Sequence, residues 1–254
     1  MGTSSPRRGP TTPLWRAAKG AATRYLSPGT AGGVSAQEVV ARYLAAVAET
    51  PGPGQPLAVF RLTRKAAQEL GAFWDEVRNQ GLPAALAARG WPAAAPDPPE
   101  MPVQALSEVL AGSGGGLEEA VVRTALALVL QPALPAPARP AADHLVRQFL
   151  ATALHLRLVL DVGESLEAAA PDSGSLQAGL DWIRVWIETG ALAAPVSAAP
   201  PATAAHWQGL MGWVWITEIM AAMLSAPASV DQRHPCAGIG CGSTTPPTLP
   251  RRRR

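Results

Sequence analysis

The sequence predicts an all-α protein, with an irregular helical core between disordered ends that are rich in proline and glycine. Hydrophobic residues make up 48% of the chain, and much of that fraction is alanine and leucine, which favour helices. Valine and isoleucine are sparse and there are only three Phe and two Tyr, although strands prefer β-branched and aromatic residues. The 26 prolines and 24 glycines gather between segments of helical periodicity, where they act as breaks.

The first helix is expected over residues 37–48. Ser35 is suited to be its N-cap, and Glu38 stands three residues later, which is the pattern of a capping box. Apolar side chains then recur at helical spacing, including Val39 and Tyr43, so that one face of this helix is expected to be buried.

The remaining core is divided by Pro- and Gly-rich segments. A short apolar run at 57–62 fits either a strand or the start of a helix. Residues 90–102 are rich in proline and are interpreted as a linker or an extended clamp. The further helices are expected at residues 63–79, 82–89, 103–110, 117–130, 144–169, 181–188 and 207–224.

This pattern predicts three regions. Residues 1–30 are expected to be a flexible N-terminal tail, residues 31–225 a helical core with a split near 90–102, and residues 226–254 a disordered C-terminal tail. Both tails are basic, although the formal net charge of +2 is too small to indicate nucleic-acid binding by itself.

Several segments bear on the compartment. Arg7 and Arg8 are not followed by an apolar run, so the start of the chain does not resemble a signal peptide. The apolar stretch at 211–224 contains Glu218 and is too short to span a membrane. The two cysteines cannot form a disulfide framework for the core. A cytoplasmic protein without a membrane segment is therefore expected.

No motif in the sequence indicates catalysis. The glycine run at 112–116 lacks the Gly-Lys-Ser/Thr of a phosphate-binding loop, and no Gly-x-Ser-x-Gly elbow exists. His144 and His155 are eleven residues apart on one expected helix, which separates them by about 16 Å and excludes a shared metal. The sequence thus predicts a protein that is not an enzyme, has no catalytic residues and needs no cofactor.

A second cluster of metal-ligand residues lies in the C-terminal tail. It offers only three soft ligands, and its cysteine spacing is not that of a zinc finger. We therefore expect no metal site, although a site completed by a partner remains an alternative. The cluster consists of His234, Cys236 and Cys241.

Tryptophans are concentrated in the last third of the chain. Trp182 and Trp186 share one helix face, whereas Trp213 and Trp215 cannot. The helix at 207–224 is therefore apolar nearly all round, which favours a place in the core and leaves a shared interface with a partner as the alternative.

The first fifteen residues have a composition unlike the core. Three prolines and two glycines oppose regular structure, so this stretch is expected to be extended and exposed. The small residue Gly2 favours removal of Met1, which would expose the Gly2 α-amine. The ordinary pKa of such an amine is about 7.7–8.0, so that part of it is a neutral nucleophile near neutral pH.

This opening carries a resemblance to a known family. Met1-Gly2-Thr3-Ser4-Ser5, followed by a Gly-Pro pair, a Pro-Leu pair and a tryptophan, resembles the start of QatB-like proteins, which are components of Qat anti-phage defence systems. Three later segments fit the same family. They are residues 15–25, 39–43 and 155–167.

The resemblance implies a non-enzymatic accessory protein of an anti-phage system that also encodes a QueC-like enzyme (QatC-like), an ATPase and a TatD-like nuclease. QueC-like chemistry transfers an activated carboxylate to an amine. The resemblance therefore implies that this chain binds the QueC-like enzyme and is its protein substrate, with Gly2 as the acceptor. The residues expected to carry modification and partner binding are Gly2, Thr3, Ser4, Ser5, Gly9, Pro10 and Trp15.

Two other functions stay open. The first is a nucleic-acid-binding adaptor or scaffold that uses the basic tails, which would show steep salt dependence of binding. The second is an enzyme in its own right, which the absence of a converging nucleophile and base disfavours.

Overall fold

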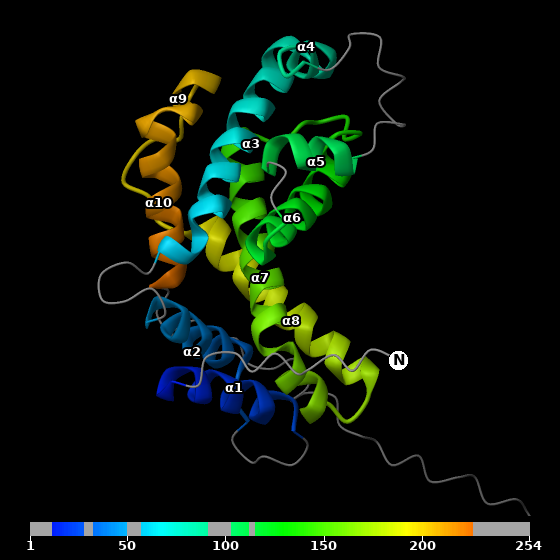
Figure 1. Ribbon diagram of the computed structural model, residues 1–254, viewed down its shortest axis with the longest axis vertical. Helices are drawn as coiled ribbons and strands as arrows, with labels where there is room; N and C mark the ends of the chain where they lie inside the picture. The colour runs from blue at the N-terminus through cyan, green and yellow to red at the C-terminus, as the bar shows by residue number, and fades with distance from the viewer. Residues whose placement is uncertain (1–11, 28–32, 50–56, 91–102, 112–114, 226–254) are drawn as a thin grey trace, which may run out of the picture.

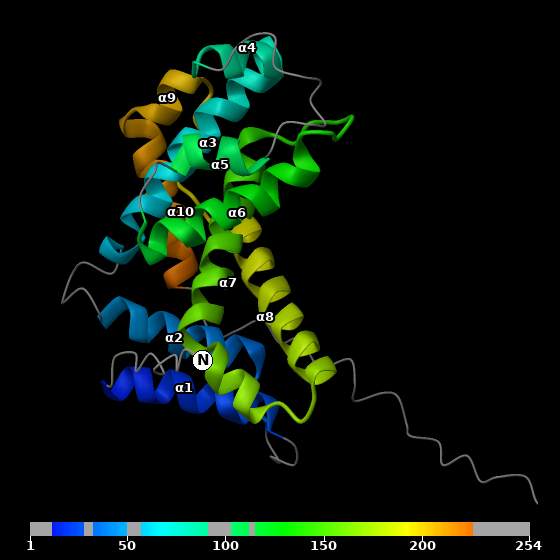
Figure 2. The ribbon, with the colours of Figure 1, turned by 45° about the vertical axis from the view of Figure 1, so that its right-hand side comes forward.

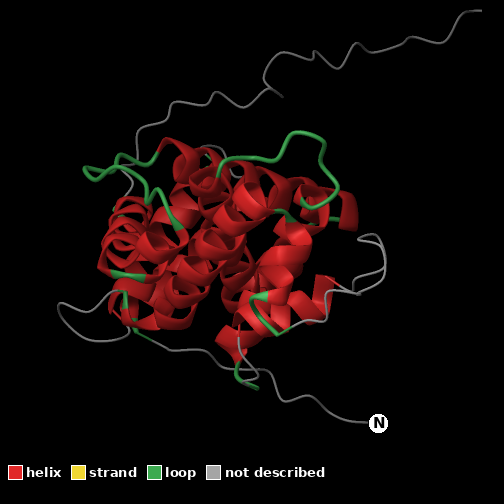
Figure 3. Ribbon diagram, turned by 90° about the horizontal axis from the view of Figure 1, so that it is seen from above, coloured by secondary structure: helices red, strands yellow, loops and turns green. Residues whose placement is uncertain are grey.

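The structure is a computed structural model that describes residues 12–27, 33–49, 57–90, 103–111 and 115–225. Within these residues the chain forms ten α-helices and a short 3-10 turn, η1, and it has no strand (Figure 3). The prediction of an all-α fold is confirmed. The elements are α1 (Pro13–Leu26), α2 (Ala36–Glu49), η1 (Ala58–Phe60), α3 (Arg61–Gln80), α4 (Leu82–Ala87), α5 (Val103–Ala111), α6 (Leu117–Ala133), α7 (Ala142–Ala169), α8 (Ser173–Ala193), α9 (Ala204–Gln208) and α10 (Leu210–Leu224).

The longest of these helices, α7, forms the centre of the fold. It spans 28 residues and buries apolar side chains along its whole length, from Leu145 and Phe149 to Leu166. Helices α1, α3, α6 and α8 all pack against it. The pair α1–α2 crosses one end of α7, and α4 lies at the opposite end of the molecule (Figures 1 and 2). One hydrophobic core joins all of these helices.

The structure corrects the prediction that residues 1–30 form a flexible tail. Residues 13–26 are the helix α1, which buries Trp15 together with three alanines, Ala18, Ala21 and Ala22. The helix begins because Thr12 is its N-cap and Pro13 occupies its first turn, where proline's fixed φ and missing N–H are tolerated. Residues 1–11, 28–30 and 226–254 of the predicted tails lie outside the described residues.

Two helix boundaries also differ from the prediction. Helix α8 extends over 173–193 rather than 181–188, since Asp172 accepts a hydrogen bond from the Ser175 backbone N–H at 2.7 Å and caps it. The single helix expected at 207–224 is broken at Gly209 into α9 and α10. The ambiguous run at 57–62 is the start of a helix and not a strand, because the 3-10 turn η1 leads directly into α3 at Arg61.

Trp207 of α9 holds the C-terminal helices onto α3. Its side chain is fully buried and meets the Trp215 ring edge-on, with ring centroids 5.2 Å apart. A Cβ atom on Gly71 of α3 would lie 2.4 Å from the Trp207 ring, so that only glycine leaves room for the indole at this crossing. The Gln68 side-chain amide donates to the Trp207 backbone carbonyl at 3.0 Å and completes the contact.

The expected split near 90–102 falls on residues 91–102, which lie outside the described residues. Helix α3, before this segment, packs against α5, α6 and α7, after it. In the described part of the chain, none of the helices is both long and apolar enough to span a bilayer.

We predict that Gly71→Ala destabilises the protein by about 1–3 kcal/mol, because a methyl group placed against the Trp207 ring forces the α3–α9 contact apart. The measurement is the free energy of unfolding by urea, followed by far-UV circular dichroism. Gly190→Ala is the matched control, since nothing lies within 4 Å of its Cβ position in α8. It should stabilise the helix by about 0.5–1 kcal/mol. Equal effects of the two substitutions would contradict the proposed packing.

Candidate functional site

The residues that the sequence singled out fall into two groups. Gly2, Thr3, Ser4, Ser5, Gly9 and Pro10 lie outside the described residues. Trp15 lies in the first turn of α1 with only 5% of its surface exposed. The part of the site that the structure describes is therefore the start of α1, where the N-terminal segment (residues 1–11) joins the helical core, which we call the body.

Thr12 fixes the start of α1 on α2. Its hydroxyl donates to Glu49 Oε2 at 2.8 Å, at the last residue of α2. The same hydroxyl oxygen accepts from the Trp15 backbone N–H at 3.5 Å. One side chain thus caps one helix and ties it to the end of its neighbour.

Trp15 and Tyr43 connect the start of α1 to the hydrophobic core. The two rings meet edge-on, with centroids 5.9 Å apart and planes at 77°, an arrangement that aromatic pairs prefer. The buried Tyr43 hydroxyl donates to Asp161 Oδ2 on α7 at 2.9 Å, and Arg157 Nε donates to the same oxygen at 3.0 Å. Burial, together with the negative charge of Asp161, raises the pKa of Tyr43 well above its usual value.

The other end of α1 is held by α8. Tyr25 donates through its hydroxyl to the Gly179 backbone carbonyl at 3.3 Å, and burial raises the pKa of Tyr25 to about 12. A Cβ on Gly179 would lie 2.6 Å from Leu26, so the glycine allows the end of α1 to approach α8 closely. Because both ends of α1 are attached, the chain before Thr12 emerges from a defined point on the body.

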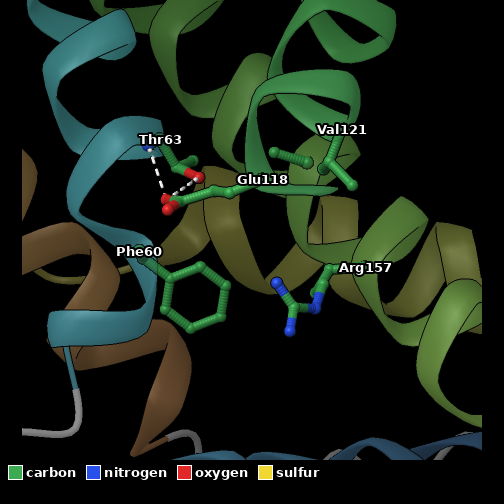
Figure 4. A pocket seen from close by; sticks show the side chains of 6 residues that line it. Phe60, Thr63, Glu118, Val121 and Arg157 are labelled. Carbon is green, nitrogen blue, oxygen red and sulfur yellow. Dashed lines mark hydrogen bonds between the residues drawn. The ribbon is translucent and has the colours of Figure 1, made fainter. Parts of the chain in front are cut away.

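A small pocket lies between α3, α6 and α7 (Figure 4). Its lining includes Phe60, Glu118 and Arg157. The Glu118 carboxylate accepts from the backbone N–H groups of Leu62 and Thr63 at 2.9 and 3.0 Å, so it caps the start of α3. The walls of this pocket lie too close together to admit a water molecule. We interpret this pocket as a structural contact rather than a ligand site.

The histidines on α7 do not converge with other reactive groups. Burial lowers the pKa of His155, and the positive charge of Arg184 on α8 lowers it further. Its imidazole is therefore neutral near pH 7. No group of three or more metal-ligating side chains exists among the described residues. The cluster of His234, Cys236 and Cys241 lies outside them.

Among the tryptophans that were expected to lie in the core or at an interface, some are buried in the core and others are partly exposed to solvent. Trp207 and Trp215 are buried, whereas Trp186 is half-buried against the core and Trp182 is 40% exposed. The Arg64 guanidinium of α3 stacks over Trp213 at 4.2 Å. The core prediction is confirmed for one side of α10. The other side exposes three apolar side chains, and an interface with a partner there stays a prediction. They are Leu210, Met211 and Val214.

Sequence reasoning missed the helix that carries Trp15. Two signals for it were present: a threonine directly before a proline, as at the start of many helices, and small or apolar residues at positions 15, 18 and 22. The prolines of the preceding residues led to the prediction of an extended tail instead of a helix. Trp15 was expected to contact a partner, and the structure instead buries it against Tyr43.

Comparison with known protein families gives one match. The family described as Qat anti-phage system associated protein QatB matches residues 52–196, which is more than half of the chain. Neither the curated proteins nor the solved structures give a match. The matched residues run from the segment before η1 to the end of α8.

We predict that Tyr43→Phe costs about 1–2 kcal/mol of stability near pH 7, because it removes the hydroxyl that donates to Asp161. Above pH 10 this difference should shrink. The unfolded wild-type chain can then release the phenol proton, whereas the folded chain, with its raised pKa, retains it, so that wild-type stability falls with pH.

The measurement for this prediction is chemical unfolding of both proteins at pH 7, 9, 10 and 11. A difference in unfolding free energy that stays constant across this range would contradict the assigned hydrogen bond and burial of Tyr43.

Proposed function

The chain belongs to the QatB family and is therefore a component of an anti-phage defence system, and we propose that it serves as a non-enzymatic substrate that presents its N-terminal segment to a QueC-like partner enzyme. The observation that carries the proposal is the attachment of α1 at both of its ends. Thr12 is bound to Glu49, and Tyr25 is bound to the Gly179 carbonyl. A segment that must enter an enzyme pocket binds with a smaller loss of entropy when one of its ends is fixed, because it samples fewer orientations before binding.

The chemistry of the segment supports the same role. After removal of Met1, the acceptor is the Gly2 α-amine. Its neutral form attacks a carboxylate that the enzyme has activated with ATP as an acyl adenylate; the amide bond forms, the bond to phosphate breaks, and AMP and the amine proton leave. Gly2 has no side chain to obstruct a narrow channel, and the residues that follow are small and polar as far as Ser5. Thr3, Ser4, Ser5, Gly9 and Pro10 are the recognition residues in this proposal. Trp15 supports them indirectly, by holding α1 in the core.

Other products of the same defence system are the expected partners. The QueC-like enzyme is the direct one, and the ATPase and TatD-like nuclease of such systems are candidates for a larger complex. A nucleic-acid adaptor remains the second candidate because α1 carries three basic residues and no acidic residue. Steep loss of DNA binding between 50 and 200 mM salt, on the order of a thousandfold, would favour that alternative.

We predict that Gly2→Leu abolishes the N-terminal adduct and the defence, while folding is retained. Leucine at position 2 prevents removal of Met1, so that the α-amine lies one residue out of register in the enzyme. The measurement is intact and N-terminal peptide mass in cells that contain the neighbouring genes. Removal of residues 251–254 is the control and should leave the adduct in place. An unmodified N-terminus that retains Met1 in the active wild-type system would refute the proposal.

We also predict that deletion of residues 2–10 abolishes defence without changing the melting temperature, because the deleted segment precedes Thr12 and leaves α1 complete. Deletion of residues 2–26 is the contrast. It removes Trp15 and the buried alanines of α1, and should lower the melting temperature by several degrees or prevent folding. A large loss of thermal stability in the shorter deletion would show that the segment is part of the core.

A further inference from the structure

The outward side of α1 differs from the rest of this helix. Positions 16, 19, 20 and 23 have the spacing of one helix face, and we call these four residues the α1 outer face: Arg16, Lys19, Gly20 and Thr23. Arg16 and Thr23 are exposed, whereas Lys19 and Gly20 are half-buried. The opposite side packs against the core through Trp15 and three alanines.

This face carries two positive charges, those of Arg16 and Lys19. Helix α1 contains no acidic residue, and neither Arg16 nor Lys19 forms an ion pair with a described residue. The carboxylates of the neighbouring helix α2 are already engaged. Glu38 pairs with Arg42 at 2.8 Å, and Glu49 accepts from Thr12 at 2.8 Å.

The length of the N-terminal segment restricts where a partner can dock. Residues 2–11, fully extended, span at most about 36 Å, and part of that length would lie inside the partner's pocket. Because the segment joins the helical core at Thr12, a partner that binds the segment is held within this distance of the start of α1. The α1 outer face starts one turn from Thr12, after the exposed residues Pro13 and Leu14, and is the charged surface nearest to Thr12 along the helix.

We propose that the α1 outer face is the docking surface for the enzyme that receives the N-terminal segment, and that it binds an acidic patch on that enzyme. This inference rests on the proposed function and specifies where the partner binds. Opposite charges across an interface accelerate association and fix its orientation. The two cations of the α1 outer face suit carboxylates on a protein better than a nucleic acid, whose binding typically neutralises many phosphates.

The test uses the full-length protein and the QueC-like enzyme encoded beside it. The rate of formation of the N-terminal adduct is followed by mass spectrometry as the concentration of this protein is varied. Arg16→Glu should raise KM about tenfold with kcat unchanged, and Arg16→Glu combined with Lys19→Glu should raise it further. The increase should diminish as salt is added, because surface charges are screened.

Arg78→Glu is the matched control. Arg78 is also an exposed helical arginine, but it stands in the last turn of α3, toward the end of the molecule opposite α1 (Figure 1). It should leave KM unchanged. The melting temperatures of all variants should remain close to that of the wild type, since each substituted side chain lies outside the core.

The outcomes separate the two proposals. If the wild type forms the adduct and Arg16→Glu behaves like Arg78→Glu, the docking surface is wrong while the proposed function stands. If the wild type forms no adduct, the proposed function fails, and the inference that rests on it fails as well. If Arg16→Glu weakens binding to a short DNA duplex but leaves KM unchanged, the face binds nucleic acid and the inference is overturned.

Discussion

Trp15 packs edge-on against Tyr43, and the Tyr43 hydroxyl donates to Asp161 on the central helix α7. This chain of contacts attaches the first two helices to the body. Without it, α1 would be held mainly by Tyr25 and Leu26 against Gly179 at its far end and by small alanine side chains, which bury little apolar area each. The same contacts fix the place where the N-terminal segment joins the core, because Thr12 caps α1 and its position depends on that helix.

The C-terminal helices depend on a second close fit. Trp207 enters the space left by Gly71 on α3, and Gly212 allows α10 to fold back beneath α9, since a Cβ there would lie 2.0 Å from the Trp207 carbonyl oxygen. Helices α1 and α2 precede the family match at 52–196, and α9 and α10 follow it. All four nevertheless bury side chains in the same core. The folding unit is therefore larger than the segment that the family comparison identifies.

In the part of the chain that the structure describes, the polar contacts of the core serve the fold. Glu118 caps α3, Asp161 joins Tyr43 to Arg157, and the pocket beside them does not admit water. The exposed apolar residues of α10 are a separate surface, and nothing in the structure indicates what covers them.

The sequence by itself determined the fold class and most helices, because alanine and leucine at helical spacing between prolines and glycines permit little else. The long helix at 144–169 and the capping of α2, where the Glu38 N–H donates to the Ser35 hydroxyl at 3.1 Å, follow from local pattern alone. The sequence also indicated the family, through its first residues. Residues 13–26 carry local signals of a helix, but only the tertiary structure decided that this helix packs on the core, that Trp15 is buried, and that the last helix breaks at Gly209. These features depend on contacts with residues that are distant in the sequence, such as Tyr43, Gly179 and Gly71. Such contacts cannot be predicted from the periodicity or composition of a single segment.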